Sequence, residues 1–455
     1  MIPVGGASQE EMVLLAHCSL GNRRRRASAA HRSVHTVPVP SVRPQSSSLN
    51  RDHFAKQSLK THPRFVTITQ LLHASLWTDI CEELGSLRFQ RSCRRMETQI
   101  HVPVGSPVIR KIPVFVDEHS VKEGAMKLIK ELRPAWEPDS VRTKSFTDGT
   151  TNKLVGCYVD DSPDDVVLVR VYGNKTELIV DRDNELKSFQ VLHANGCAPR
   201  LYCTFQNGIC YEFMQGDALG PQDVRDPTLI RLISREMARI HAIHAHNGCI
   251  PKPNLWIKMR QYFSLVATEF TDQASNIRIQ QEVPSKAVLE QEMVWMKEHL
   301  STLGSPVVLC HNDLLCKNII HNSKEGHVRF IDYEYSSYNY QAFDIGNHFN
   351  EFAGMAELDY GLYPSPQMQM DWLKQYLQAY KLFTKNTDQV SQRELETLYV
   401  QVNKFALASH FFWGFWALIQ AKYSTIDFDF LGYAVLRFNQ YFHIKPTVMA
   451  LQIPE

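Results

Sequence analysis

Three oxygen-bearing side chains are spaced along one stretch of the chain in a pattern that could carry out chemistry. The stretch Val307–Asn318 reads VVLCHNDLLCKN, with Asp313 two residues after His311 and Asn318 five residues after Asp313. A second apolar run leads to Asp332, fourteen residues beyond Asn318. Phosphoryl transfer from ATP needs a carboxylate that accepts the proton of the attacking hydroxyl and two oxygen ligands for magnesium. The spacing therefore indicates phosphoryl-transfer chemistry.

Each residue of this pattern has an expected role. Asp313 is the candidate base, a role worth roughly 10²–10⁴ in rate. Asn318 and Asp332 are the candidate Mg²⁺ ligands, and His311 is expected to brace the loop rather than to contact substrate. A lone His-x-Asp-x-x-x-x-Asn match can arise by chance in a solvent loop. The additional aspartate, at the distance found in kinases and with a strand-like run before it, favours the catalytic interpretation.

Two charged residues upstream fit the same chemistry. Arg170 ends the apolar run Val166–Val169, where kinases usually place a lysine. An arginine there can still pair with phosphates, as a rigid fork. Glu185, in the helix predicted next, is its expected ion-pair partner. Taken alone, both would be assigned to the surface, but the catalytic loop favours placing them in the catalytic site.

A polar segment before the first predicted strand lies where a phosphate-covering loop should be. The segment Phe146–Lys153 reads FTDGTTNK and has one glycine rather than a cluster. As a phosphate signal it is weak, and a plain polar turn is an equal alternative. Hydroxyl and backbone N–H groups could contact the nucleotide, and Asn152 is the nucleotide-binding residue assigned there.

The elements that must position these residues follow from the hydrophobic pattern. The first part predicts strand, strand, helix, strand and strand over Leu154–Val159, Val166–Val171, Asp181–Asn195, Leu201–Phe205 and Ile209–Met214. The second part predicts helices over Thr228–His244, Lys286–Leu300, Met368–Phe383 and Ser391–Tyr423. The order predicts an α+β, two-lobed, protein-kinase-like fold, with a small antiparallel-sheet N-lobe over 96–215 and a larger, mainly helical C-lobe over 216–455.

Composition limits the remaining possibilities. The chain has 455 residues, more than one ordinary domain needs, and a formal net charge of +1, which gives no argument for nucleic acid. Its 10 cysteines are irregularly spaced, which favours a reducing compartment, and no apolar run is long enough to predict membrane insertion. Residues 1–95 are expected to be a disordered or atypical extension, with a transit peptide as the alternative.

Acidic and aromatic residues in the second part raise the question of the substrate. Glu334, Glu351 and the run Phe411–Trp416, FFWGFW, could surround an organic cation through charge and cation–π attraction. From the pattern alone, the aromatic stripe would be helix core and the two glutamates would be surface residues.

Three long segments resemble the choline/ethanolamine kinase family. They are HNDLLCKNII, FIDYEYSSYNYQAFDIGNHFNEFAG and ASHFFWGFWALIQAKYSTIDFDF, within a similarity that runs from about Ile100 to Glu455. The resemblance implies a two-lobed protein-kinase-like fold. It also implies Mg²⁺-dependent transfer of the ATP γ-phosphate to the hydroxyl of ethanolamine, a small-molecule substrate, for phosphatidylethanolamine synthesis in the cytoplasm. The sequence carries no signal for an oligomeric state.

The resemblance also assigns roles by position. Asp313 matches the base, Asn318 and Asp332 match the Mg²⁺ ligands, and Arg170 matches an arginine that replaces the kinase lysine. The segment that would hold adenine through its backbone comprises Glu212, Phe213, Met214 and Gln215. The positions that match the amine pocket are Glu334, Tyr335, Glu351, Trp413, Trp416 and Tyr433, which reverses the assignment of the tryptophans to core.

One departure from the choline kinases bears on the substrate. They carry further aromatic residues just after the position of Glu351, whereas Phe352–Ala356 reads FAGMA here. A thinner aromatic cage suits a primary ammonium, which has three N–H donors, better than a trimethylammonium, which has none. We therefore expect ethanolamine as substrate. Choline kinase activity and a catalytically silent pseudokinase that acts as a binding module are the alternatives, and the intact triplet Asp313, Asn318 and Asp332 argues against the second.

Overall fold

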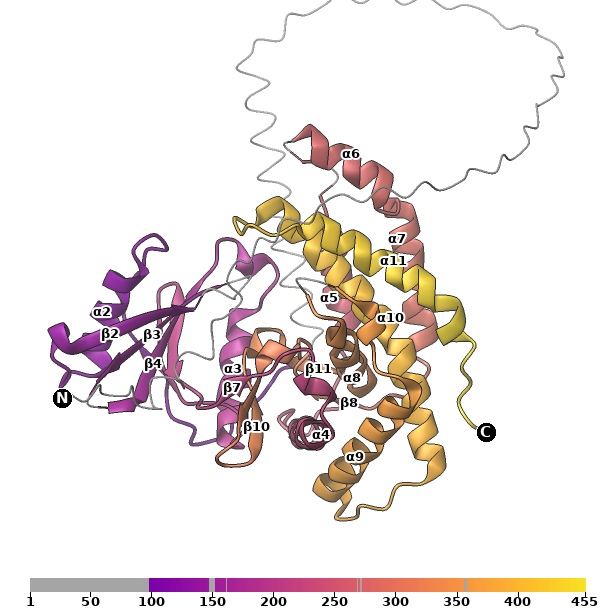
Figure 1. Cartoon of the computed structure of the whole chain (residues 1–455), viewed down its shortest axis with the longest axis horizontal. Coiled ribbons are helices and arrows are strands. Elements are labelled where there is room, and N and C mark those ends of the chain that lie inside the picture. Colours follow the sequence, from indigo (N-terminus) through magenta and orange to yellow (C-terminus); the bar gives the residue numbers. More distant parts are fainter. Residues whose placement is uncertain (1–97, 147–151, 161, 268, 271, 356–357) are drawn as a thin grey trace, which may run out of the picture. The chain divides into compact units, whose positions relative to one another are not determined.

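The computed structural model describes residues 98–455, apart from 147–151, 161, 268, 271 and 356–357. The predicted extension over 1–95 and the centre of the predicted phosphate loop lie outside the described residues. In Figure 1, strands dominate the first part of the described chain and helices dominate the second. This distribution confirms the α+β class, while the division at residues 215 and 216 stays a prediction.

A six-stranded sheet in the order β1-β5-β6-β4-β3-β2 forms the first part. All its neighbouring strands are antiparallel except β1 and β5, a parallel pair added at one edge. The four predicted strands are present; β4 begins earlier than predicted because Ser162 already pairs with Val159. The strands are β1 (Arg110–Lys111), β2 (Val141–Phe146), β3 (Asn152–Val159), β4 (Ser162–Tyr172), β5 (Leu201–Phe205) and β6 (Gly208–Glu212).

The hairpin between β5 and β6 fixes the position of the central strand β4. Asn207 accepts a hydrogen bond through its backbone carbonyl from Tyr172 N–H at 2.9 Å. A Cβ atom at Gly208 would overlap the backbone carbonyl of Arg170 and the ring of Phe205. Glycine is needed at this position because the turn lies directly against the strand that carries Arg170.

The helix that follows β4 is α3 (Arg182–Ala194), as predicted. The side chain of Asp181 caps it by accepting a hydrogen bond from Asn184 N–H at 3.2 Å. Phe189 and Leu192 are buried in the main hydrophobic core, and Gly196, with φ +66°, follows the helix end. This packing directs Glu185, one turn earlier, inward beside β4.

The second part is mainly helical. Predicted α4, α7, α9 and α10 are present, although α4 ends at His241 rather than at His244. The 32-residue α10 begins with a capping box between Ser391 and Glu394, and it packs against α8 and α11. The helices are α4 (Pro227–His241), α5 (Leu255–Leu265), α6 (Gln273–Glu282), α7 (Lys286–Leu300), α8 (Gln341–Asn350), α9 (Pro366–Lys385), α10 (Gln392–Tyr423) and α11 (Phe430–Met449), in addition to α2 (Val121–Leu132) in the first part.

Two small sheets carry the segments with the candidate catalytic residues. Their strands are β7 (Asp217–Ala218), β8 (Val307–Cys310), β9 (Ile319–Asn322), β10 (His327–Phe330) and β11 (Ser337–Tyr340). Strand β8 pairs with β11, and β9 lies between β7 and β10. No helix in the described ranges is long and apolar enough to cross a membrane.

Candidate active site

The loop between β8 and β9 carries Asp313 and passes through a rarely populated backbone conformation. Asn312 has φ +68°, and Asp332, on the facing segment, has φ +64°. Left-handed conformations of this kind cost roughly 1–3 kcal/mol for residues other than glycine and persist only where the surroundings impose them. Here the side chain of Asn312 donates to Tyr335 O and to Ser337 Oγ, both at 2.9 Å. The turn before Asp313 is therefore fixed from outside the loop.

A buried carboxylate on α8 holds the same turn. Asp344 accepts hydrogen bonds from the backbone N–H groups of His311, at 2.8 Å, and Asn312, at 2.7 Å. It also pairs with His241 Nε2 at 2.9 Å, and His241 Nδ1 lies 2.6 Å from the hydroxyl of Tyr376. Burial would raise the pKa of Asp344, but its bonds and the nearby histidines hold that pKa below its usual value. The sequence analysis missed this brace.

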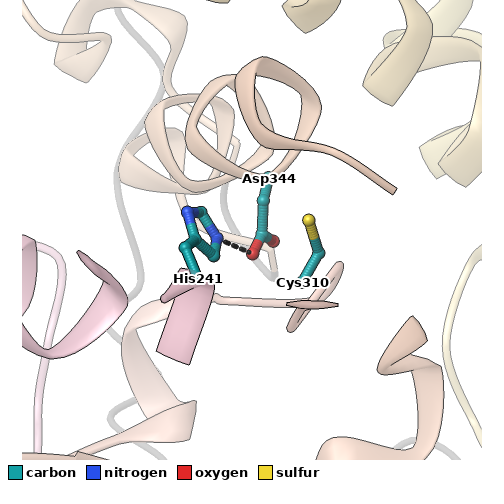
Figure 2. Close-up of side chains that lie close together, drawn as sticks. All are labelled: His241, Cys310 and Asp344. Atoms are coloured by element: carbon teal, nitrogen blue, oxygen red, sulfur yellow. Dashed lines mark hydrogen bonds and ion pairs between the residues drawn. The ribbon is translucent and has the colours of Figure 1, made fainter. Parts of the chain in front are cut away.

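Figure 2 shows Cys310 beside His241 and Asp344, three groups that could in principle hold a metal ion. Their donor atoms are already engaged: the Cys310 thiol donates to Asn339 O at 3.5 Å, and Asp344 accepts three hydrogen bonds. Burial also raises the pKa of Cys310 well above its usual value, which disfavours the thiolate that a metal needs. The cluster therefore supports the catalytic loop.

Asp313, the candidate base, is partly buried among other carboxylates. Burial, followed by the nearby charges of Asp332, Glu351 and Glu334, raises the pKa of Asp313 well above its usual value. Asn318 donates through Nδ2 to Asp313 O at 2.9 Å, which leaves its amide oxygen available. These contacts place the candidate base next to one candidate metal ligand.

His311 braces the loop, as predicted. It lies 2.9 Å from Ile331 O through Nε2 and accepts from Asp313 N–H through Nδ1 at 3.3 Å. Burial lowers the pKa of His311, which agrees with a neutral ring that donates from one nitrogen and accepts at the other.

The predicted pair between Arg170 and Glu185 is present, and it extends to Asp332. Arg170 forms an ion pair with Glu185 and donates through Nη1 to Asp332 Oδ1 at 2.6 Å. Burial and the neighbouring Glu334 raise the pKa of Asp332 to about 6, while Arg170 opposes that shift. Asn318 lies close by because its backbone carbonyl accepts from Ile331 N–H at 3.0 Å. The two candidate metal ligands are therefore held on adjoining segments.

Glu334 and Asn152, predicted for different ligands, lie in contact with each other. Asn152 donates through Nδ2 to Glu334 Oε2 at 3.0 Å. The same oxygen accepts from Arg182 Nη1 at 2.9 Å. The sequence analysis did not assign Arg182 to the site. Its position was a usable signal, because a positive charge in the first turn of a helix opposes the helix dipole and so suggests a role other than helix stability.

Three of the four aromatic residues predicted for the amine pocket, Tyr335, Trp413 and Trp416, form one group. Trp416 Nε1 donates to the hydroxyl of Tyr335 at 2.9 Å, and the ring of Tyr335 lies edge-on to Trp413 at 5.2 Å between centroids. The Trp413 and Trp416 rings are 5.6 Å apart. These side chains are largely buried, so they also contribute to the core, as the pattern alone had indicated.

Glu351 and Tyr433 meet through a residue that the sequence analysis missed. Arg437, which is fully buried, donates through Nη1 to Glu351 Oε1 and to the Tyr433 hydroxyl, both at 2.9 Å. Through Nη2 it donates to Ser409 Oγ at 3.0 Å. The pocket therefore contains its own buried cation, and Glu351 is half of an ion pair rather than a free carboxylate.

The segment predicted to hold adenine follows β6. Glu212 accepts through its carboxylate from Arg200 N–H at 3.0 Å, and Phe213 N–H donates to Val166 O at 3.2 Å. Within the described part of the chain, the backbone N–H groups of Met214 and Gln215 donate no hydrogen bond. These two groups remain available to a ligand.

Together, the sheet, the helical part and the Asp313 loop define a phosphotransferase of the protein-kinase-like class. A family model described as choline/ethanolamine kinase matches residues 143–442, and this chain belongs to that family.

Similar proteins extend over most of the chain. Ethanolamine kinase 1 of Homo sapiens is 63% identical over 363 residues, 79% of this chain and 80% of that protein. Ethanolamine kinase 2 of Homo sapiens is 61% identical over 356 residues, 78% of this chain and 89% of that protein. The solved structure of a Plasmodium vivax ethanolamine kinase is 28% identical and superposes with a TM-score of 0.63, over 72% of this chain and 89% of that chain.

Proposed function

We propose that the protein transfers the γ-phosphate of ATP to the hydroxyl of ethanolamine and so supplies phosphoethanolamine for phosphatidylethanolamine synthesis in the cytoplasm. The observation that carries the proposal is the cluster of carboxylates around the partly buried Asp313: burial first, and then the nearby charges of Asp332, Glu351 and Glu334, raise the pKa of Asp313 well above its usual value. A base with a raised pKa near several carboxylates suits a hydroxyl carried by a small cation, because the carboxylates attract the cation and the base accepts the hydroxyl proton. The high identity to ethanolamine kinases supports this substrate.

Asp313 would accept the hydroxyl proton as the oxygen attacks phosphorus. General-base assistance of this kind is worth roughly 10²–10⁴ in rate. A carboxylate is a more effective base at neutral pH when its pKa is raised toward about 7. The catalytic loop is fixed by Asn312 and Asp344, so the base is already in place before substrate arrives. Most of the remaining acceleration would come from positioning and charge neutralisation.

The residues near Asp313 suit a magnesium ion. Asn318 offers an amide oxygen and Asp332 a carboxylate, both hard oxygen donors of the kind that Mg²⁺ prefers. A magnesium ion held by Asn318 and Asp332 would supply the positive charge that neutralises the phosphates. Arg170, now paired with Asp332, would extend its guanidinium to the phosphates while Glu185 keeps it anchored. Asn152 would then contact the nucleotide from the start of β3.

The adenine would lie against the segment over residues 212–215. The free backbone N–H groups of Met214 and Gln215 can donate to the ring. Phe213 stacks on Phe146 at 6.5 Å between centroids, which places an apolar surface next to them.

The amine end of the substrate would lie among the six residues assigned to the pocket. Glu334 and Glu351 would attract the cation through the carboxylate oxygens that Arg182 and Arg437 do not hold. Tyr335, Trp413, Trp416 and Tyr433 would supply aromatic surface. Phe352 does not add to that surface, because it is 1% exposed and packs against Phe349 and His348. The segment after Glu351 therefore adds no aromatic face for a trimethylammonium group.

The test is the initial rate of ADP release by the full chain with ATP and Mg²⁺, measured separately with ethanolamine and with choline. We expect rapid turnover of ethanolamine and little turnover of choline. A preference for choline would replace the substrate but keep the catalytic residues. Turnover of neither, in protein shown to be folded by circular dichroism, would favour the pseudokinase alternative.

A further inference from the structure

Arg182, the first residue of α3, contacts three polar residues assigned to the proposed site, Glu185, Glu334 and Asn152. Its Nη1 donates to Glu185 Oε2 and to Glu334 Oε2, both at 2.9 Å. Its Nη2 donates to Thr176 Oγ1 at 2.7 Å and to Asn152 Oδ1 at 3.3 Å. The guanidinium also lies 3.8 Å from the ring centroid of Tyr172. Only 16% of the side chain is exposed, so these contacts hold it in one orientation.

These contacts complete a chain of alternating charges. Asp332 pairs with Arg170, Arg170 with Glu185, Glu185 with Arg182, and Arg182 with Glu334. The chain begins and ends on one short segment, residues 332–334, and crosses β4 and α3 in between. Arg182 therefore links the phosphate side of the site to the amine side.

The geometry at Glu334 indicates what this link does. Arg182 and Asn152 both donate to Oε2, whereas no described residue donates to Oε1. The side chain of Glu334 is 2% exposed, so it cannot reorient freely in water. One oxygen is thus held by the protein, and the other is left for the N–H groups of a cation.

We propose that Arg182 is a positioning residue for the amine substrate: by holding Oε2 of Glu334, it aims Oε1 at the ammonium group. The inference rests on the proposed function. It assigns to Arg182 a part in amine affinity although Arg182 need not contact the substrate. Its location at the start of α3, where its charge opposes the helix dipole, is not explained by helix stability.

The test measures binding rather than turnover. Ethanolamine is titrated into the full chain without nucleotide or magnesium, and the fluorescence of Trp413 and Trp416 reports the dissociation constant. Arg182→Met should weaken ethanolamine binding by about tenfold, the effect of one misdirected charge-assisted hydrogen bond. Binding of the non-hydrolysable nucleotide AMP-PNP with Mg²⁺ should weaken much less. Arg182→Lys should recover part of the ethanolamine affinity, because a lysine supplies the charge without the fork.

Two comparisons separate positioning from a general structural role. Arg142→Met, which removes an exposed arginine paired with Asp160, should leave both affinities unchanged. In a Glu334→Gln background, Arg182→Met should have little further effect on ethanolamine, because the group that it positions is already altered.

The outcomes distinguish the inference from the function. If the wild-type chain binds no ethanolamine, the proposed function fails and the inference falls with it. If the wild type binds and Arg182→Met binds equally well, the inference is wrong and the function stands. If Arg182→Met loses ethanolamine and AMP-PNP affinity equally and also has a lower melting temperature, Arg182 has a structural role only. That result would also overturn the inference.

Discussion

Oδ1 of Asp344 accepts a hydrogen bond from the backbone N–H of Asn312 at 2.7 Å. Asn312 is the left-handed residue that immediately precedes Asp313, and the bond comes from α8, which is buried along its whole length. The conformation of the catalytic loop is therefore imposed by a helix that begins about thirty residues later in the sequence.

Replacement of Asp344 should reduce turnover without removing substrate binding. Asp344→Asn loses the charge that accepts from two backbone N–H groups, so the loop can shift. A displacement of about 1 Å can lower kcat by about 10²-fold. Steady-state kinetics should show this fall with a nearly unchanged KM for ATP. Asp371→Asn, at an exposed position of α9, is the matched control. An Asp344→Asn enzyme with wild-type kcat would show that the brace is dispensable.

Replacement of Asp313 should remove the base but not the nucleotide site. Asp313→Asn keeps the size of the side chain and loses its capacity to take a proton, so kcat should fall by roughly 10²–10⁴. Calorimetric titration with AMP-PNP and Mg²⁺ should give an affinity close to that of the wild type. Near-normal turnover would show that another group accepts the proton.

The buried pair of Glu351 and Arg437 should dominate the stability of the amine pocket. Glu351→Gln leaves a fully buried guanidinium without its counter-charge, which should lower the free energy of unfolding by roughly 3–5 kcal/mol. In urea denaturation, the double variant Glu351→Gln, Arg437→Met should lose less free energy of unfolding than the sum of the losses in the two single variants. The exposed pair of Arg142 and Asp160 provides the comparison, since Asp160→Asn should cost less than about 1 kcal/mol. Additive losses at Glu351 and Arg437 would contradict their coupling.

His348 should make the fold sensitive to mild acid. Burial lowers the pKa of His348 to about 4, below the value of about 6.5 expected in the unfolded chain. Between these values the unfolded state binds the extra proton. Stability is therefore fully present above about pH 6.5 and falls by on the order of 3 kcal/mol as the pH drops to about 4.

Urea denaturation at several pH values tests this dependence. His348→Asn, which keeps a donor for Leu314 O, should flatten the pH dependence of the free energy of unfolding. His119→Asn, at an exposed histidine, should leave it unchanged. An equally steep pH dependence in His348→Asn would assign the effect to other groups.

The sequence predicted the elements that have a clear local signal. The predicted helices began at Asp181 and Ser391, the residues that cap α3 and α10, and the two predicted strands on either side of Asn207 and Gly208 are β5 and β6. Helix α8 was missed: all ten of its residues are buried, and the polar residue Asp344 bonds to the catalytic loop rather than to water. Helices α2, α5, α6 and α11 were missed as well.

Side chains that act through distant partners could not be predicted. Arg437 lies 86 residues from Glu351, and Arg182 lies 152 residues from Glu334, so no spacing in the sequence links them. The ion pair between Arg170 and Glu185 could be predicted, because the strand and the helix that carry these residues follow each other in the sequence. The loop motif identified Asp313, Asn318 and Asp332. The residues that hold the loop and the pocket in place could be identified only from the fold.

The central claim is that this protein phosphorylates ethanolamine in preference to choline. The most direct measurement is a competition, in which equal concentrations of both alcohols react in one tube with ATP, Mg²⁺ and the full chain. Quantification of the two phosphorylated products at low conversion gives the ratio of their kcat/KM values. We predict that phosphoethanolamine exceeds phosphocholine by at least about tenfold, which corresponds to a difference of about 1.4 kcal/mol. Equal amounts, or an excess of phosphocholine, would contradict the account of the amine pocket.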